Sequence, residues 1–248
     1  MTKFLGIMSA KGGVGKTTTA LNIATAMAGF NSRVVLIDGN LSTPHIGVHL
    51  GLVKDVKSIN SVFNNEESLM DVIYQHSSGL GIILGDISLK FNSNQFVKTV
   101  RSLNGLFDYV IVDSPAGMNN DTLNVIECID KALIVVNPDI LSCTEGLRLI
   151  RLIESKNKTV LGVILNKVSE DKFEINKKDI EIMLGKKILI EIPEDKIFKR
   201  VLSEGKILVH SYPNNKISEI YKVLGAYLVG KEYKNKWKSL MEYFKTQK

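Results

Sequence analysis

The chain has 248 residues, of which 44% are hydrophobic and 23% are charged, with 19 glycines, 5 prolines and 2 cysteines. This composition is typical of a globular protein and excludes a disordered, collagen-like or disulfide-built chain. No stretch approaches the roughly 18 uncharged apolar residues of a membrane span, and no apolar leader opens the chain, so we expect neither a span nor a secretory signal. The formal net charge of +6 does not decide between nucleic acid and anionic lipid as a partner.

Short apolar runs rich in Val, Ile and Leu alternate along the chain with segments of helical periodicity. The apolar runs predict buried strands at 4–8, 34–37, 80–84, 109–112, 132–136, 160–165 and 188–192. The segments with helical periodicity lie at 17–28, 94–103, 123–129, 145–153 and 176–184. This alternation is typical of a doubly wound α/β fold with a mainly parallel sheet, because parallel strands need helical crossovers. No repeat or linker divides the chain, so we expect one domain over 1–230 and a tail over 231–248.

A glycine-rich loop connects the first predicted strand to the first predicted helix. Its sequence is Ser9-Ala10-Lys11-Gly12-Gly13-Val14-Gly15-Lys16-Thr17-Thr18. In this setting backbone N–H groups and a helix N-terminus can surround a polyphosphate, while Lys16 reaches the β- and γ-phosphates and Thr17 ligates Mg²⁺. Ala10 stands where the strict P-loop pattern has glycine, so the loop is a variant in which Ala10 needs a negative φ. The loop predicts nucleotide binding.

Lys11 makes the loop similar to the deviant Walker A loop of the MinD/ParA family of P-loop ATPases, in which a second lysine stands early in the loop. Four further segments resemble the family in order along nearly the full chain: LIDGN at 36–40, VDSPAG at 112–117, LNKV at 165–168 and IPED at 192–195. The segments at 112–117 and 192–195 resemble the MinD branch, whose archaeal and bacterial members position the septum site or other cellular machinery. The resemblance implies a P-loop NTPase fold of the SIMIBI type with about seven or eight strands.

The resemblance also implies the residues that hold the nucleotide and the metal. The cofactors would be ATP or ADP with Mg²⁺, and the metal-supporting residues are Thr17, Asp38 and Asp113. The adenine edge would be bound by the side-chain amide of Asn166, although an Asn at a strand end is also a common turn former. The complete nucleotide-binding set would be Gly12, Gly13, Val14, Gly15, Lys16, Thr17, Thr18, Asn166, Pro193, Glu194 and Asp195.

The catalytic set that the resemblance implies is Lys11, Lys16, Asp38 and Asn40. Lys11 would reach across an ATP-dependent homodimer to the partner's phosphates, as an arginine finger does. At position 40 the chain departs from the family, which has an aspartate there to orient the attacking water. An amide can hydrogen-bond water but cannot accept its proton. We therefore expect slow ATP hydrolysis that depends on dimerisation or on a protein activator.

His45 and His49 are four residues apart, a spacing that places two imidazoles on one face of a helix. No third ligand is evident nearby, so we interpret this segment as lying near the nucleotide or the dimer interface rather than as a metal site. Cys128 and Cys143 form no CxxC pair and are expected in the core. They therefore do not supply the cysteine pair that iron–sulfur scaffold ATPases with a similar loop need.

The tail from Lys231 to Lys248 holds six lysines and two glutamates, and its large apolar residues are spaced as on one face of a helix. These apolar residues are Tyr233, Trp237, Leu240, Met241 and Phe244. One interpretation is an interfacial helix that binds an anionic membrane, which would make the protein cytoplasmic and peripheral on the inner face of the cell membrane. The alternative is a terminal helix docked on the sheet with its lysines in water.

The function that these patterns favour is a MinD-like ATPase whose ATP-dependent dimerisation controls the position of cellular machinery. Lysine-rich pairs at 177–178, 186–187 and 199–200 leave open a ParA-like alternative, in which a positive face binds DNA non-specifically. Such lysines are usually only solvated, so DNA is the less favoured partner. A third alternative is an ATP-binding adaptor that hardly hydrolyses its nucleotide.

Overall fold

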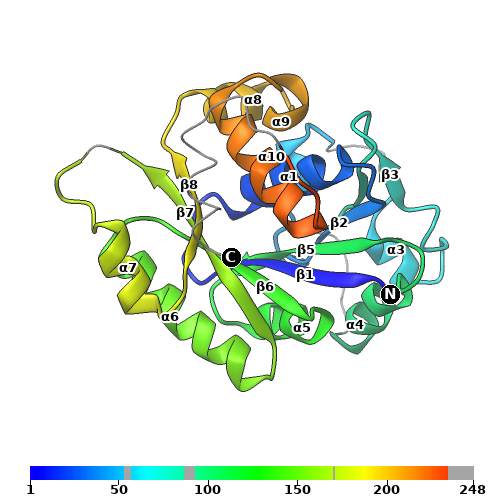
Figure 1. The fold of residues 1–248 in the computed structure, drawn as a ribbon. Helices are drawn as coiled ribbons and strands as arrows, with labels where there is room; N and C mark the ends of the chain where they lie inside the picture. Colours follow the sequence, from blue (N-terminus) through cyan, green and yellow to red (C-terminus); the bar gives the residue numbers. More distant parts are fainter. Residues whose placement is uncertain (53–56, 87–92, 170, 234–248) are drawn as a thin grey trace.

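The computed structural model describes residues 1–52, 57–86, 93–169 and 171–233. Within these ranges one eight-stranded sheet has the order β3-β4-β2-β5-β1-β6-β7-β8 (Figure 1). Neighbouring strands are parallel except at the edge, where β3 runs antiparallel to β4. The strands are β1 (Lys3–Ser9), β2 (Val34–Asp38), β3 (Ile73–Gln75), β4 (Gly81–Ile83), β5 (Tyr109–Ala116), β6 (Lys131–Val136), β7 (Thr159–Val168) and β8 (Ile188–Pro193).

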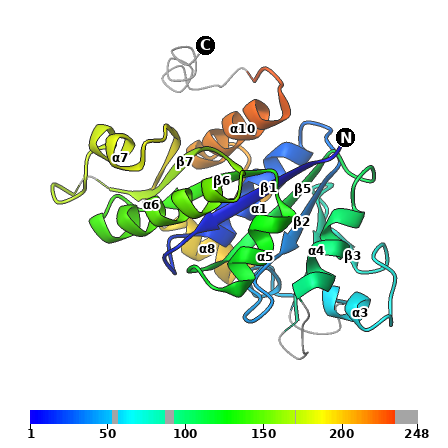
Figure 2. The ribbon, with the colours of Figure 1, turned by 90° about the horizontal axis from the view of Figure 1, so that it is seen from below.

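Helices cover both faces of this sheet (Figure 2). One face packs against α1, α8, α9 and α10, and the other against α4, α5, α6 and α7, giving two hydrophobic cores. The helices are α1 (Lys16–Ala28), α2 (Ile46–His49), α3 (Ile59–Phe63), α4 (Ser93–Ser102), α5 (Asn120–Cys128), α6 (Ile140–Ser155), α7 (Lys177–Leu184), α8 (Ile197–Ser203), α9 (Leu208–Ser211) and α10 (Lys216–Val229). None of the helices in the described ranges is long and apolar enough to cross a membrane.

The predicted doubly wound fold is confirmed, and all seven predicted strands are present. The central strands are apolar on both faces because helices cover both, as in β2, where every residue is buried. The sequence analysis missed β3, whose three residues are all partly or fully exposed and form no apolar run. Its place in the sheet comes from pairing with β4, which no local pattern shows.

The sequence analysis also assigned no helix to the segments that form α8, α9 and α10. The longest of them, α10, lies against α1 (Figure 1). Contact between the two helices is close at Gly225, where an added Cβ would lie 2.8 Å from the Cβ of Ala26. The Asn215 side chain accepts a hydrogen bond from the N–H of Ile217 and so caps the start of α10. Gly230 ends the helix in the left-handed conformation, with φ of 71°.

Residues 231–233, which follow Gly230, are not helical and contact the domain. Tyr233 donates hydrogen bonds to the buried carboxylate of Glu219 and packs edge-on against Phe30, with ring centroids 5.5 Å apart. The Tyr233 side chain therefore contacts α10 and Phe30, which follows the end of α1. The predicted apolar and basic residues from 234 to 248 lie outside the described residues.

Candidate functional site

A cavity of about 490 Å³ opens at the carboxyl ends of β1, β2 and β5. Open α/β sheets bind their ligands at this edge. The glycine-rich loop forms one wall, and the segments that follow β2 and β5 form the others. The lining residues include Lys11, Gly12, Gly13, Val14, Gly15, Lys16, Thr17, Thr18, Asn40, Thr43, His45, His49, Ala116, Asn119 and Lys167.

The glycine-rich loop holds unpaired backbone donors beside the N-terminus of α1. Gly13 and Gly15 have φ of 74° and 90°, values that favour glycine, whereas Ala10 is not among the residues with positive φ. The backbone N–H groups of residues 12–15 make no hydrogen bond with another described residue, and no side chain caps α1. Donors of this kind at a helix N-terminus fit an anion such as a polyphosphate.

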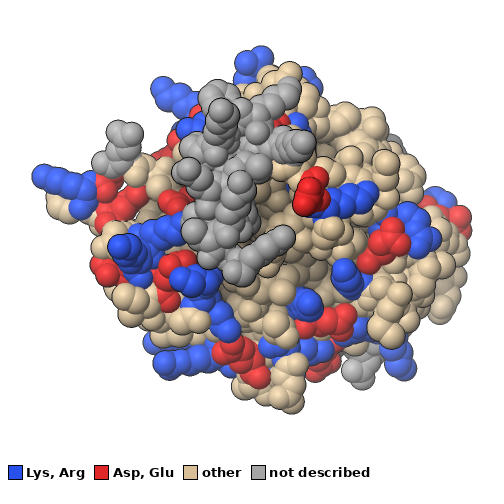
Figure 3. All heavy atoms as spheres, in the orientation of Figure 1, with Lys and Arg blue, Asp and Glu red and all other residues tan. Residues whose placement is uncertain are grey.

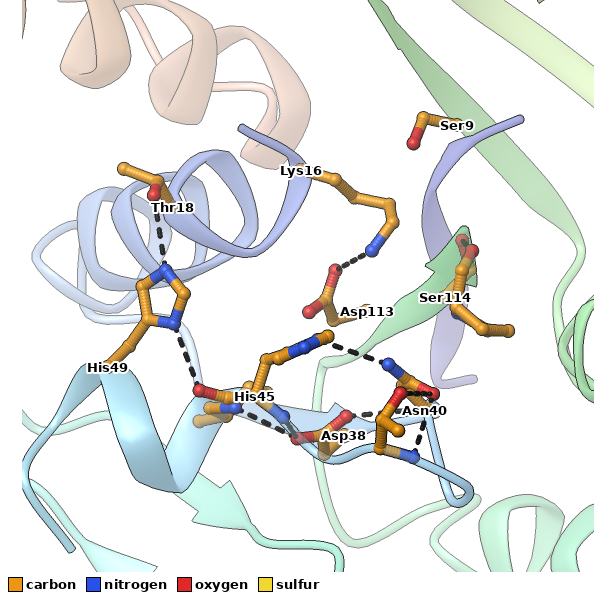
Figure 4. Close-up of polar contacts among 12 residues, drawn as sticks. Ser9, Lys16, Thr18, Asp38, Asn40, His45, His49, Asp113 and Ser114 are labelled. Atoms are coloured by element: carbon orange, nitrogen blue, oxygen red, sulfur yellow. Dashed lines mark hydrogen bonds and ion pairs between the residues drawn. The ribbon is translucent and has the colours of Figure 1, made fainter. Parts of the chain in front are cut away.

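Lys16 and Asp113 form a buried ion pair at the floor of the site (Figure 4). Lys16 Nζ lies 3.2 Å from Asp113 Oδ1, and their side chains are 8% and 1% exposed. The second carboxylate oxygen, Asp113 Oδ2, is buried and has no hydrogen-bond partner among the described residues. A buried carboxylate oxygen without a partner is unfavourable in the free protein, and it fits a hydrated Mg²⁺ ion.

Asp38 lies behind the cavity, and its carboxylate holds the start of α2. Its Oδ2 accepts hydrogen bonds from the N–H groups of His45 and Ile46 at 2.8 and 2.9 Å, and its Oδ1 accepts from Asn40 N at 3.1 Å (Figure 4). Burial, and then the charge of Asp113 on the neighbouring strand, raise the pKa of Asp38 to about 7. In this structure Asp38 therefore positions the wall of the cavity rather than lining it.

The segment after β2 brings several polar side chains to the cavity. Asn40 Nδ2 lies 3.1 Å from His45 Nδ1, and Asn40 Oδ1 accepts from the N–H and hydroxyl of Thr43 at 3.2 and 3.1 Å. Thr18 Oγ1 lies 3.5 Å from His49 Nε2. His45 and His49 thus lie at the predicted nucleotide site, and no cluster of three or more His, Cys, Asp or Glu fit for a metal occurs in the described ranges.

Lys11 is held within its own chain by a carboxylate at the start of α6. Its Nζ lies 3.0 and 3.1 Å from the two carboxylate oxygens of Asp139, and the two side chains are 33% and 42% exposed. Asp139 also caps α6 by accepting from the N–H of Ser142. The sequence pattern gave no sign of this pair, because the two residues lie on loops after different strands.

The end of β7 supports the glycine-rich loop through two consecutive side chains. Asn166 Nδ2 donates to the carbonyl of Val14 at 2.6 Å, and Lys167 Nζ donates to the carbonyl of Gly13 at 2.7 Å. Lys167 lines the cavity and has a left-handed backbone with φ of 58°. The sequence analysis did not single out Lys167. In the predicted segment, Pro193 is the last residue of the neighbouring strand β8, Glu194 and Asp195 follow it, and none of the three lines the cavity.

Two further features bear on the alternative functions. Four of the six residues in the basic pairs form ion pairs with acids: Lys177 with Glu191, Lys186 with Glu154, Lys187 with Glu181 and Arg200 with Glu204. Basic and acidic side chains are also interspersed on the face shown in Figure 3, so these pairs do not form a uniformly positive surface. Cys128 and Cys143 are free thiols buried in the core, as predicted.

Comparison with known proteins gives the family. A family model described as ParA, "NUBPL iron-transfer P-loop NTPase", matches residues 1–228. An uncharacterized ATP-binding protein of Methanocaldococcus jannaschii, MJ0169, is 32% identical over 228 residues, which cover 90% of this chain and 87% of that protein.

Solved structures agree with this match. The septum site-determining protein MinD of Pyrococcus horikoshii, complexed with Mg-ADP, superposes with a TM-score of 0.86 at 25% identity, covering 92% of this chain and 96% of that one. The MinC:MinD cell division complex of Aquifex aeolicus gives a TM-score of 0.84 at 29% identity, covering 95% and 99%. Together with the loop, the cavity and the eight-stranded sheet, these matches show that the chain belongs to the MinD/ParA family of P-loop ATPases.

Proposed function

We propose that this chain is a Mg²⁺-dependent ATPase whose nucleotide state controls its dimerisation and, through the dimer, the position of cellular machinery. The observation that carries the proposal is the set of unpaired N–H groups at residues 12–15 around a cavity that also presents Lys16 and Thr17. The likeness to a MinD that is complexed with Mg-ADP supports ATP or ADP with Mg²⁺ as cofactors.

The residues present suit these cofactors. The loop N–H groups and Lys16 would bind the phosphates, and Thr17 with the unpaired oxygen of Asp113 would hold Mg²⁺, directly or through water. When bound, the metal would neutralise charge on the phosphates. Lys16 would then exchange its carboxylate partner Asp113 for phosphate oxygens, which frees both oxygens of that carboxylate.

The nucleotide assignment is tested by calorimetric titration of Mg-ATP into Lys16→Ala. We expect the variant to lose binding by about 100-fold or more, because a charge-assisted contact with the phosphates is removed. Lys187→Ala removes an exposed lysine outside the cavity and serves as the matched control. An ATP affinity that is the same in Lys16→Ala and in the wild type would overturn the phosphate-loop assignment.

The proposed dimer depends on Lys11 leaving Asp139 for the partner's nucleotide. Asp139→Asn keeps a capping side chain at the start of α6 but removes the negative charge that holds Lys11. We expect this variant to dimerise with Mg-ATP at several-fold lower protein concentration, and Lys11→Ala to bind ATP but remain monomeric. Light scattering that shows a normal ATP-dependent dimer of Lys11→Ala would count against the cross-subunit role.

Slow hydrolysis is supported by the contacts of Asn40. Both acceptor positions of its Oδ1 are taken by Thr43, so in this arrangement the amide cannot accept a hydrogen bond from an attacking water. We expect Asn40→Asp to raise ATP turnover by at least about tenfold. Turnover that is indistinguishable from the blank in both proteins, combined with tight ATP binding, would identify an ATP-binding adaptor instead.

We also propose that residues after Tyr233 attach the dimer to an anionic membrane. Each lysine in the tail would add up to about 1 kcal/mol at such a surface, and two tails on one dimer would bind far more tightly than one. Sedimentation with anionic liposomes in Mg-ATP and in Mg-ADP tests this for the full chain and for a chain cut after Tyr233, which keeps that residue's contacts with Glu219. ATP-dependent pelleting that survives the cut would exclude the tail as the anchor.

A further inference from the structure

The side-chain amide of Asn40 has a fixed orientation. A backbone N–H can only donate, so the contact between Thr43 N and the Asn40 side chain requires the amide oxygen at that end. The hydroxyl of Thr43 donates to the same oxygen. The amide nitrogen must therefore point the other way, to His45 Nδ1 at 3.1 Å, as Figure 4 shows.

This orientation determines the tautomer of His45. Because Asn40 Nδ2 donates, His45 Nδ1 must accept, and a neutral imidazole that accepts at Nδ1 carries its proton on Nε2. The contact with Asn40 thus requires a neutral ring, and desolvation followed by the charge of Lys16 lowers the pKa of His45 in the same direction. His45 Nε2 has no hydrogen-bond partner among the described residues and is free to donate.

The placement of His45 comes from its backbone. Asp38 accepts the N–H of His45 at 2.8 Å, which fixes the residue at the start of α2, and the side chain lines the same cavity as Lys16. In Figure 4 the His45 ring lies on the side of the site that holds Lys16 and Asp113. Lys16 is the residue that would reach the β- and γ-phosphates, and its charge acts on the His45 ring in the same cavity.

We infer that His45 is a specificity-determining residue that donates from Nε2–H to a terminal phosphate oxygen and so favours the triphosphate over the diphosphate. Asn40 is its positioning residue, because it holds the ring and the tautomer that can donate. Asn40 and His45 together present hydrogen-bond donors to the cavity, whereas the family has a carboxylate, an acceptor, at position 40. Donors suit the binding of an anion, but they cannot accept a proton from an attacking water. This inference rests on the proposed nucleotide site.

The test compares two affinities in the same proteins. Calorimetry measures Mg-ADP and the Mg²⁺ complex of a non-hydrolysable ATP analogue with the wild type, His45→Ala and His45→Gln. We expect His45→Ala to weaken the analogue about tenfold or more while ADP changes little, since a hydrogen bond to a charged oxygen is lost only with the triphosphate. The glutamine variant keeps an N–H at the position of Nε2 and should restore most of the preference.

A matched control and three outcomes make the result decisive. His76→Ala removes a histidine that packs against His210 outside the cavity and should leave the ratio of the two affinities unchanged. Equal weakening of both nucleotides by His45→Ala would mean that the side chain only shapes the cavity, and no weakening would mean that it makes no contact; either result overturns the inference. A wild type that binds neither nucleotide would instead overturn the proposed function.

A second measurement needs no nucleotide. The chain has 4 histidines, so the imidazole nitrogens of a ¹⁵N-histidine-labelled sample can be assigned by NMR. We expect His45 of the wild type to carry its proton on Nε2, and Asn40→Asp to move a proton to Nδ1, because a carboxylate can only accept there. A wild-type His45 protonated on Nδ1 would contradict the assigned pair.

Discussion

At the scale of single residues, the site concentrates buried charge around two neighbouring carboxylates. Asp38 on β2 is directly opposite Asp113 on β5 in the strand register, and both side chains are almost completely buried. Lys16 pairs with Asp113, whereas Asp38 has only backbone N–H groups as hydrogen-bond partners among the described residues. In the free protein, burial and the charge of Asp113 therefore disfavour ionisation of the Asp38 carboxyl group.

This arrangement predicts a pH dependence of stability. The pKa of Asp38 is raised to about 7 in the folded protein, against about 4 in an unfolded chain. Between these values the folded state holds a proton that the unfolded state has released, so the free energy of unfolding contributed by Asp38 falls as pH rises from about 4 to 7.

Urea denaturation of the wild type and of Asp38→Asn at about pH 5 and about pH 8 checks this. The variant cannot titrate at this position, although it is less stable overall because it loses an acceptor for Asn40 or for α2. From pH 5 to pH 8, we expect the free energy of unfolding of the wild type to fall by roughly 1–4 kcal/mol more than that of the variant. Parallel losses in the two proteins would show that Asp38 does not titrate in this range.

At the scale of secondary-structure elements, the ends of strands hold the loop that would bind phosphates. Two consecutive residues of β7, Asn166 and Lys167, donate to two consecutive loop carbonyls. The glycine at position 15 is part of this contact, because a Cβ there would lie 2.3 Å from the amide nitrogen of Asn166. The loop is therefore shaped by a strand that is far from it in the sequence.

These contacts predict that Asn166→Ala weakens phosphate binding whatever base the ligand carries. We expect the affinity for Mg-ATP and that for Mg-tripolyphosphate each to fall by about fivefold or more. The reason is that the variant lacks the hydrogen bond to the Val14 carbonyl whichever ligand is bound. Lys167→Met removes the bond to Gly13 and offers a matched comparison. Titration calorimetry provides the affinities, and a loss confined to ATP would show instead that Asn166 acts mainly on the adenine edge.

At the scale of the whole molecule, the last described residues, 231–233, contact the body of the domain. Glu219 of α10 is 1% exposed. Its carboxylate forms an ion pair with Lys222 and accepts a hydrogen bond from the hydroxyl of Tyr233. The Tyr233 ring contacts Phe30, and the Lys231 ammonium donates to the Phe30 carbonyl. Residues 231–233 are therefore held beside α1 and α10.

This anchor predicts different stabilities for two truncations. A chain cut after Gly230 leaves Glu219 without the Tyr233 hydroxyl, and we expect it to lose roughly 1–3 kcal/mol in the free energy of unfolding. A chain cut after Tyr233 should match the full chain. Tyr233→Phe isolates the hydroxyl from the ring contact, and urea unfolding of all four proteins gives the comparison. Equal stability of the two truncated chains would show that the anchor contributes nothing.

The sequence by itself determined the doubly wound fold, because buried parallel strands must be apolar on both faces and helices must connect them. It also located the glycine-rich loop, whose residue types and spacing suit a phosphate in any protein that places them between a strand and a helix. The residues from Gly12 to Thr18, with Asn40, His45 and His49, do line one cavity. These features depend on short stretches of chain, which local patterns can show.

Only the tertiary structure decided which side chains hold one another. The pair of Lys11 with Asp139, the support of the loop by Asn166 and Lys167, and the anchoring of Tyr233 on Glu219 all join residues from distant segments. The orientation of the Asn40 amide is local in sequence, yet it depends on a turn that Asp38 holds through buried hydrogen bonds. Hydrogen-bond partners depend on which side chains are close together and buried in the folded protein. The spacing of residues along the chain does not predict this for residues from distant segments.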